Sequence, residues 1–143
     1  MTQLPKSEHP LLVRTDFSDD AAWKALREAA EKPSSKLLGL IKFRAHVEIL
    51  DDRAFDGLDV KELLALLPQK HNQAVLFAVD SKSITHKDRP ILVVELQKTP
   101  ARTFRVIPSE LWNVENNLSL CNMGFEEFVS ALGRDGIFRG FTF

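Results

Sequence analysis

The sequence predicts a single α/β domain with a mixed, mostly five-stranded sheet and about four helices, parallel and wound in its amino-terminal half and antiparallel in its carboxyl-terminal half. Two nearly continuous apolar runs, residues 74–79 and 91–96, are typical of central strands covered on both faces. Strand-like and helix-like segments alternate before the first run, which indicates right-handed crossovers between parallel strands. Only residues 81–90 separate the two runs, and a parallel crossover takes about a dozen residues or more, so the second run should return antiparallel to the first.

The first elements follow from local patterns. Residues 1–10 are polar and proline-containing and are expected to form a flexible lead-in, while residues 11–143 are expected to form the domain. An apolar stretch predicts a strand over residues 11–17. Ser18 is expected to cap the helix that follows, and Pro33 ends it.

The middle of the chain predicts a further strand and a second helix. Apolar and polar residues alternate over 43–49, which is the period of a strand with one face in water, at or near a sheet edge. Asp59 and Glu62 have the spacing of a capping box in front of an apolar segment with helical period. Pro68 closes this helix.

The carboxyl-terminal part predicts one more strand and two helices. The strand covers residues 103–107, and after Pro108 the hydroxyl of Ser109 is placed to cap a short helix. The apolar positions of the second helix recur at i, i+3, i+4 and i+7, and they are Phe125, Phe128, Val129 and Leu132.

Composition and charge limit the classes of function. Nineteen basic and twenty acidic residues give a net charge of −1, so we expect no nucleic acid and no anionic membrane as partner. No apolar run approaches the length of a membrane-spanning helix, and residues 1–10 are polar, so we expect no signal peptide. The single cysteine, Cys121, excludes an internal disulfide and fits a cytoplasmic protein.

Acidic side chains follow three of the predicted strands. Asp16, Asp51, Asp52 and Asp80 all stand at strand carboxyl ends, where open α/β sheets build their ligand crevices. If these strands are neighbours, the carboxylates converge, and they would then bind a divalent cation or face a basic partner. The alternative is that each aspartate caps the next helix or turn.

No motif supports catalysis. The glycines form neither GxGxxG nor GxxxxGK[ST], the four histidines lie far apart without a metal-ligand pattern, and no serine lies in a GxSxG segment. Cys121 is expected to be a small buried residue rather than a nucleophile. We therefore assign no catalytic residue and no cofactor.

Asparagines are concentrated between the last two helices. They are expected to cap helix ends and hold the loop by side-chain hydrogen bonds. A polar pocket lined by Asn117, Asn122 and Arg139 is the functional alternative.

Phe138, Phe141 and Phe143 lie in the carboxyl-terminal tail, where large apolar groups need to be covered. Packing into the protein's own sheet is the favoured interpretation. Self-association through the tail is the alternative.

Several segments resemble a family of small bacterial proteins that is known as a domain of unknown function. The resemblance is carried by LLVRTDFSDDAAW at 11–23, ENNLSL at 115–120, NMGFEEF at 122–128 and DGIFRGF at 135–141. Residues 34–42 are less typical and are expected to be a local elaboration. The resemblance implies a family but no activity and no catalytic residues.

Two functions are compatible with these features. The leading hypothesis is a non-catalytic interaction module, an adaptor or an immunity-type protein, that binds a partner of basic surface through the acidic loops. The second is a divalent-metal-dependent enzyme or small-ligand domain built around Asp16, Asp51 and Asp80.

Overall fold

The structure is a computed structural model that describes residues 3–36 and 39–141. Its centre is a mixed six-stranded sheet in the order β4–β1–β5–β6–β7–β8, which confirms the predicted α/β domain with one strand more than expected. The strands are β1 (Leu11–Arg14), β4 (Glu48–Leu50), β5 (Val75–Val79), β6 (Ile91–Glu95), β7 (Thr103–Val106) and β8 (Ile137–Phe138).

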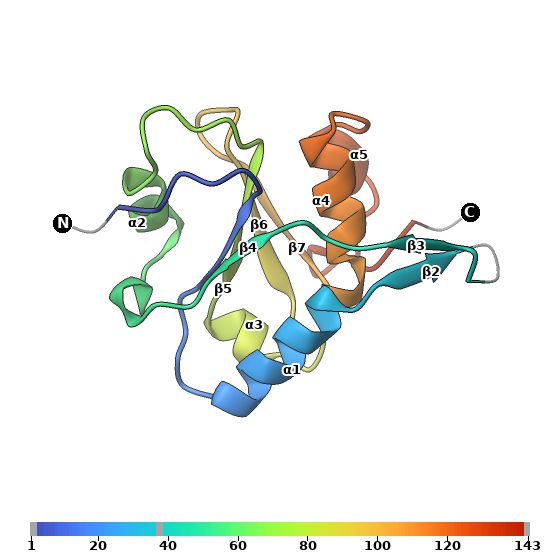
Figure 1. Ribbon diagram of the computed structural model, residues 1–143, viewed down its shortest axis with the longest axis horizontal. Helices are drawn as coiled ribbons and strands as arrows, with labels where there is room; N and C mark the ends of the chain where they lie inside the picture. Colours follow the sequence, from blue (N-terminus) through green and yellow to red (C-terminus); the bar gives the residue numbers. More distant parts are fainter. Residues whose placement is uncertain (1–2, 37–38, 142–143) are drawn as a thin grey trace.

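Helices cover both faces of the sheet (Figure 1). In the described part of the chain there are five, α1 (Asp20–Glu31), α2 (Val60–Ala65), α3 (Ser81–Thr85), α4 (Leu111–Ser119) and α5 (Phe125–Val129), with 3-10 turns η1 (Arg53–Phe55) and η2 (Pro108–Glu110). Helix α2 lies on one face, and α1, α4 and α5 lie on the other (Figure 1).

The amino-terminal half is parallel, as predicted. Strand β1 pairs in parallel with β4 on one side and with β5 on the other. The chain leaves β1 through α1 on one face and returns from β4 to β5 through α2 on the opposite face, so the sheet is wound in both directions.

The second half is antiparallel only as far as β7. Strands β5 and β6, and β6 and β7, pair antiparallel, and the apolar runs occupy the predicted central positions. Strand β8 pairs in parallel with β7. Helix α3 lies within residues 81–90, which the sequence predicted only as a connection.

Alternating side chains of the strands build two apolar layers. On the α1 side, Leu12 and Phe77 pack with Trp23 and Leu26. On the α2 side, the main buried residues are Leu4, Leu11, Val13, Phe55, Leu63, Leu76, Ala78 and Val94. Leu4 belongs to the segment before β1, and its N–H donates to the carbonyl of Leu66 over 2.8 Å.

The predicted continuous strand over 43–49 is wrong. Its first residue belongs to β3 (Ile41–Phe43), which forms a separate hairpin with β2 (Ser34–Lys36), and its end belongs to β4. Between them, α4 side chains take the place of a neighbouring strand. The amide of His46 donates to Glu115 over 2.6 Å, and the side chain of Asn116 donates to the carbonyl of Arg44 over 2.9 Å.

Two of the predicted caps also differ. Asp19, not Ser18, caps α1, because its carboxylate accepts from the amide of Ala22 over 3.0 Å while Ser18 bonds to Asp16. No side chain caps η2 or α4, so Ser109 does not have the predicted role. The capping box of Asp59 and Glu62 is confirmed.

The tail packs into the domain, as the favoured interpretation required. Phe138 is fully buried in β8, and Phe141 lies 4.9 Å from it, ring centre to ring centre. Phe143 lies outside the described residues. Across residues 3–36 and 39–141, no helix combines the length and apolarity needed to cross a bilayer.

Candidate functional site

The carboxyl ends of β4, β1 and β5 meet at one edge of the sheet. The parallel registers place Val13 beside Leu50 and Arg14 beside Val79. The loops that follow these strands therefore start side by side, at the lower left of Figure 1. They hold all the aspartates predicted to converge, Asp16, Asp51, Asp52 and Asp80.

Arg14 joins two of these loops from within. It is 5 % exposed, and its guanidinium donates to Asp20 over 2.6 Å and to Asp51 over 3.3 Å. The guanidinium also lies 4.3 Å from the ring centre of Phe17. A backbone bond of 2.7 Å from Gly57 to the carbonyl of Thr15 ties the same loops together.

Seven aspartates form the surface of this edge, which we call the acidic rim. They are Asp16, Asp19, Asp20, Asp51, Asp52, Asp56 and Asp59, and all are exposed except Asp16, which is half-buried. Only Arg14 and Arg53 offset them in the same two loops. The rim surrounds a hollow of about 550 Å³ whose walls include Asp16, Phe17, Asp56, Leu58 and Asp80.

Most rim carboxylates have local hydrogen bonds, so the capping roles considered from the sequence are present. Asp16 accepts from the amide of Ser18 over 2.8 Å, and Asp52 accepts from the amide of Ala54 over 2.9 Å. Asp56 is an exposed member of the rim for which no side-chain hydrogen bond or ion pair is present in residues 3–36 and 39–141. It is therefore the rim carboxylate best placed to meet another molecule.

Asp80 has a stronger, partly buried partner. Arg105, from β7, donates to its two carboxylate oxygens over 2.9 and 2.7 Å. Burial raises the pKa of Asp80, but the hydrogen bonds and charge of Arg105 together with bonds from Ser83 outweigh it, and the pKa lies below its ordinary value. Asp80 is thus a structural anion at neutral pH.

The rim does not form a ligand set for a metal ion. Within the described ranges, no group of three or more histidine, cysteine, aspartate or glutamate side chains is arranged to hold one. The hydrogen bonds of Asp16, Asp51, Asp52 and Asp80 point to four different partners instead of to one centre. The carboxylates share an edge but not a ligand position.

The structure does not gather Asn117, Asn122 and Arg139 in one pocket. Asn117 donates to the carbonyl and side-chain oxygens of Asn113 over 2.9 and 2.8 Å. Asn122 lines a hollow beside Phe125, whereas Arg139 lines a different one with Trp112 and Phe141.

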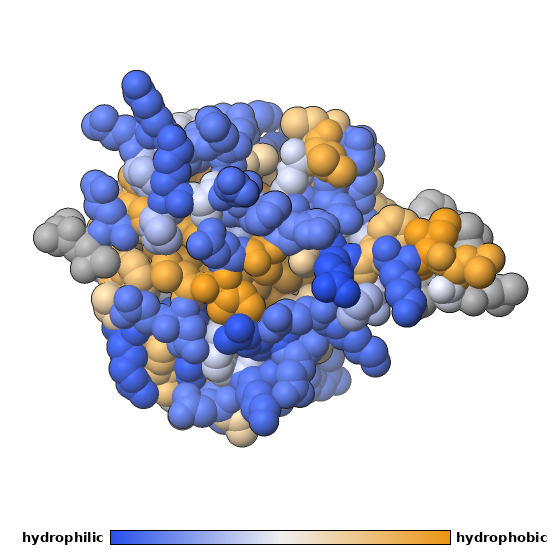
Figure 2. All heavy atoms as spheres, viewed as in Figure 1, coloured by the Kyte–Doolittle hydropathy of each residue, from blue (hydrophilic) through white to orange (hydrophobic). Residues whose placement is uncertain are grey.

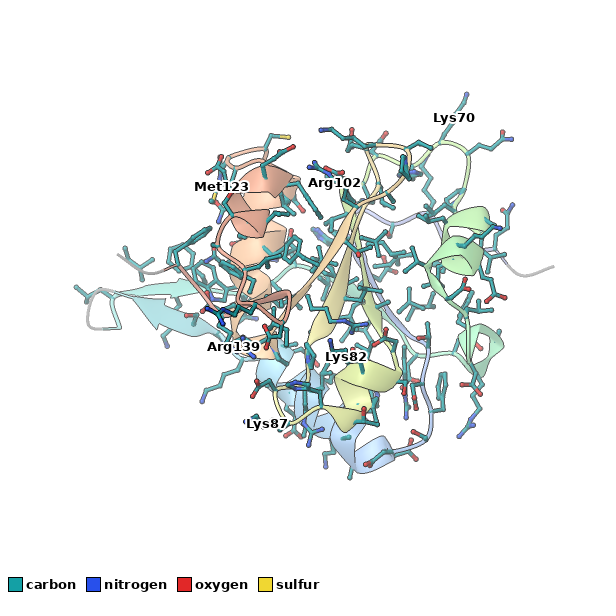
Figure 3. The ribbon with its side chains drawn as sticks, turned by 180° about the vertical axis from the view of Figure 1, so that it is seen from behind. Lys70, Lys82, Lys87, Arg102, Met123 and Arg139 are labelled. Atoms are coloured by element: carbon teal, nitrogen blue, oxygen red, sulfur yellow. The ribbon has the colours of Figure 1, made fainter. Side chains whose placement is uncertain are left out.

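Arg139 is held by two acids on the face shown in Figure 3. It donates to Asp135 over 3.2 and 2.8 Å and to Asp88 over 2.9 Å. These hydrogen bonds lower the pKa of Asp135 to about 2 and also hold the pKa of Asp88 below its ordinary value. Arg139 therefore acts as a clamp between the last turn and the loop before β6.

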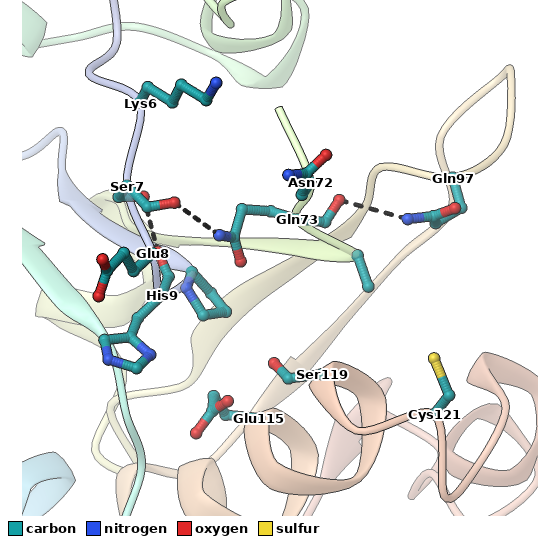
Figure 4. A pocket seen from close by; sticks show the side chains of 12 residues that line it. Lys6, Ser7, Glu8, His9, Asn72, Gln73, Gln97, Glu115, Ser119 and Cys121 are labelled. Atoms are coloured by element: carbon teal, nitrogen blue, oxygen red, sulfur yellow. Dashed lines mark hydrogen bonds between the residues drawn. The ribbon is translucent and has the colours of Figure 1, made fainter. Parts of the chain in front are cut away.

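A second hollow, of about 600 Å³, lies at the opposite edge of the sheet (Figure 4). Ser7 and Gln73 meet on one wall, where the side chain of Gln73 donates to the carbonyl of Ser7 over 2.8 Å. Glu115, which is 3 % exposed, and Cys121 lie on the α4 side. The burial of Glu115 was not predicted, since nothing in the sequence around this glutamate indicates it.

Cys121 is the second residue after the end of α4 and follows the C-cap residue Leu120. Its φ is +58°, the amide of Asn122 donates to the carbonyl of Asn117 over 2.9 Å, and the amide of Cys121 donates to that of Leu118 over 3.3 Å. This is a Schellman cap with a left-handed residue after the helix. Cys121 is exposed, contrary to the expected buried position.

We expect Cys121→Gly to raise the free energy of unfolding by about 0.5 to 1 kcal/mol, because glycine adopts the left-handed backbone without the clash that a Cβ causes. Chemical denaturation measures the change. Cys121→Ala keeps the Cβ and is the control, so it should give no such gain. Equal stabilisation by both variants would show that loss of the thiol, and not relief of the backbone, is responsible.

The chain matches the model of a protein family. A family model described as "Domain of unknown function (DUF6924)" covers residues 9–141, which confirms the resemblance noted in the sequence. A search of curated proteins finds no match.

Proposed function

We propose that this chain, which belongs to the DUF6924 family of domains of unknown function, is a non-catalytic interaction module of the adaptor or immunity type. Its acidic rim binds a basic surface on a partner protein. The observation that carries the proposal is the clamp of Arg14 on Asp20 and Asp51, which holds two acidic loops side by side at one edge.

The rim is organised before any partner binds. Arg14, the bond from Gly57 to Thr15 and the aspartate caps fix the loops in place. A surface of this kind loses little conformational entropy on binding. Clustered negative charge also speeds the approach of a basic partner and selects against acidic ones.

The charge states favour ion pairing over proton transfer. The hydrogen bond and the charge of Arg14 hold the pKa of Asp20 below its ordinary value, and the pKa of Asp80 is also lowered. Such groups remain ionised at neutral pH. A general acid needs a pKa raised toward neutrality instead.

A lysine-rich peptide labelled with a fluorophore tests the rim directly. We expect its binding, followed by anisotropy, to weaken as salt increases, and Asp56→Lys to weaken it about three- to tenfold at low salt. Asp56 has no structural bond to lose, so the variant should keep its fold.

Glu8→Lys is the matched control, because Glu8 is also exposed and lies before β1, at the other edge of the sheet. It makes the same change in net charge and should leave more of the binding intact. Equal losses in the two variants would show an effect of net charge alone. The absence of binding by the wild type at low salt would contradict the proposal.

A further inference from the structure

The hairpin β2–β3 stands apart from the main sheet. It forms its own two-stranded sheet, with Lys36 paired to Ile41 and Ser34 paired to Phe43. In Figure 1 it projects at the right, and Figure 2 shows apolar residues at its outer end. An isolated two-stranded hairpin is marginally stable in water, so its base needs support.

The base of the hairpin is anchored to α4. The ring of Phe43 stacks on Trp112 with a centroid distance of 4.9 Å and an interplanar angle of 20°. The side chain of Asn116 donates to the carbonyl of Arg44 over 2.9 Å. These contacts hold the hairpin in a fixed orientation relative to the domain.

Two apolar side chains at the start of β3 have no such cover. Leu40 is 85 % exposed and Ile41 is 41 % exposed, and they follow Gly39, whose φ is +82°. Among the described residues, the other large apolar side chains with high exposure are Leu120 and Val129, which lie elsewhere. A protruding apolar end costs solvation energy unless a partner surface receives it.

The charged residues in this segment of the sequence are all basic. Residues 32–47 contain four basic residues, Lys32, Lys36, Lys42 and Arg44, and no aspartate or glutamate, although the whole chain has a net charge of −1. Two hairpins paired with each other would bring these like charges together, which disfavours a second copy. A surface that complements these basic and apolar side chains is anionic and has an apolar layer beneath its charges.

We propose that the β2–β3 hairpin docks on the surface of an anionic lipid bilayer. Leu40 and Ile41 enter the boundary between headgroups and acyl chains, and Lys42 and Arg44 pair with lipid phosphates. This combination of apolar burial and basic attraction is the usual basis of reversible membrane-surface binding. Lysine and arginine stems extend along the apolar layer while their charges stay at the phosphates.

The rest of the molecule favours one orientation on that surface. The acidic rim and the hairpin lie toward opposite sides in both Figure 1 and Figure 3. An anionic bilayer repels the rim and attracts the hairpin, so the rim faces away from the lipid and stays accessible. This differs from our expectation from the sequence, which considered the net charge of the whole chain and not its distribution.

Vesicle sedimentation tests the proposal. The full chain is expected to sediment with vesicles of phosphatidylcholine and phosphatidylserine and to stay in solution with phosphatidylcholine alone. Leu40→Ser should lower the partition coefficient about five- to tenfold by removing apolar burial. Lys42→Glu should lower it about tenfold or more by reversing a charge at the surface.

Leu120→Ser is the matched control, because it removes an exposed leucine outside the hairpin and should leave sedimentation unchanged. Circular dichroism checks that each variant folds. The proposal is overturned if the wild type does not bind the anionic vesicles, or if Leu120→Ser weakens binding as much as Leu40→Ser. It is also overturned if the wild type does not bind vesicles but instead forms a dimer, or binds an acidic protein, and Leu40→Ser abolishes that association.

Discussion

Replacement of Phe128 by alanine is expected to lower the free energy of unfolding by about 3 to 5 kcal/mol. Phe128 is fully buried at the centre of an aromatic cluster. Its ring centre lies 5.1 Å from that of Phe138, 5.3 Å from that of Phe141 and 6.0 Å from that of Phe104. The variant loses apolar burial and leaves a cavity that the surrounding β-strands cannot close.

Denaturant unfolding at neutral pH measures this change. Val129→Ala is the control, because Val129 is the next residue in α5 but is 41 % exposed, and the change should stay within about 0.5 kcal/mol. Similar losses in both variants would show that α5 itself, and not the aromatic cluster, limits stability. A loss below about 1 kcal/mol for Phe128→Ala would show that the tail does not pack on α5 as described.

The aromatic cluster also shows what sequence patterns predict well. The helical spacing of Phe125, Phe128, Val129 and Leu132 predicted the buried face of this helix. Phe125 and Phe128 are buried, but Val129 is exposed, and Leu132 lies beyond the end of α5. The need to cover large apolar groups placed Phe138 inside the domain, as the structure confirms. Burial of this kind depends on a local period or on a strong solvation cost, and both can be read along a single chain.

Elements that depend on tertiary partners were predicted less well. Residues 43–49 alternate as a strand does, yet their polar backbone is satisfied by Glu115 and Asn116, about seventy positions away in the sequence. The spacing of polar and apolar residues gives the face of a segment but not the identity of its hydrogen-bond partner. For the same reason the hairpin over residues 34–43 was recognised only as an atypical segment.

In the candidate site, the position of the aspartates was predictable from the sequence, but their hydrogen-bond partners were not. Strand order and the direction of the crossovers predicted a common edge for Asp16 and Asp80, and both line one hollow there. The arginine partners at this edge were not predictable, since Arg14 pairs with Asp20 and Asp51, and Arg105 reaches Asp80 from another strand. Because these arginine partners could not be inferred from the sequence, metal binding by the aspartates remained an alternative at that point.

Replacement of Arg105 by methionine is expected to lower the free energy of unfolding by about 2 to 3 kcal/mol at pH 7. Methionine keeps much of the apolar stem but leaves Asp80 partly buried without its two hydrogen bonds of 2.9 and 2.7 Å. A partly buried anion that loses its partner costs less than a fully buried one and more than an exposed one.

Arg27→Met is the matched control. Arg27 pairs with Glu31 over 2.8 Å, but both side chains are exposed on α1. Such i,i+4 pairs contribute about 0.3 to 0.5 kcal/mol. Urea unfolding should therefore show a loss of unfolding free energy that is several-fold larger for Arg105→Met than for Arg27→Met.

The dependence on pH identifies the ion pair as the cause. In the wild type the pKa of Asp80 lies below its ordinary value of 3.8, so its contribution to stability is present above that pH and is lost as the pH falls through the lowered pKa. In Arg105→Met, burial still raises the pKa of Asp80 while the opposing arginine is absent, so the pKa is higher than in the wild type. In the variant, Asp80 is therefore protonated at a higher pH, and protonation removes the cost of an unpaired, partly buried anion.

The difference in stability between wild type and Arg105→Met should therefore be largest near pH 7 and should shrink as the pH falls below about 4. The other acids with lowered pKa values, such as Asp20 and Asp135, titrate in both proteins and cancel in the difference. A difference that stays constant from pH 7 to pH 3 would assign the loss to the bond of 3.1 Å from Arg105 to the carbonyl of Pro90, or to packing of the stem. Asp80 would then be only the cap of α3.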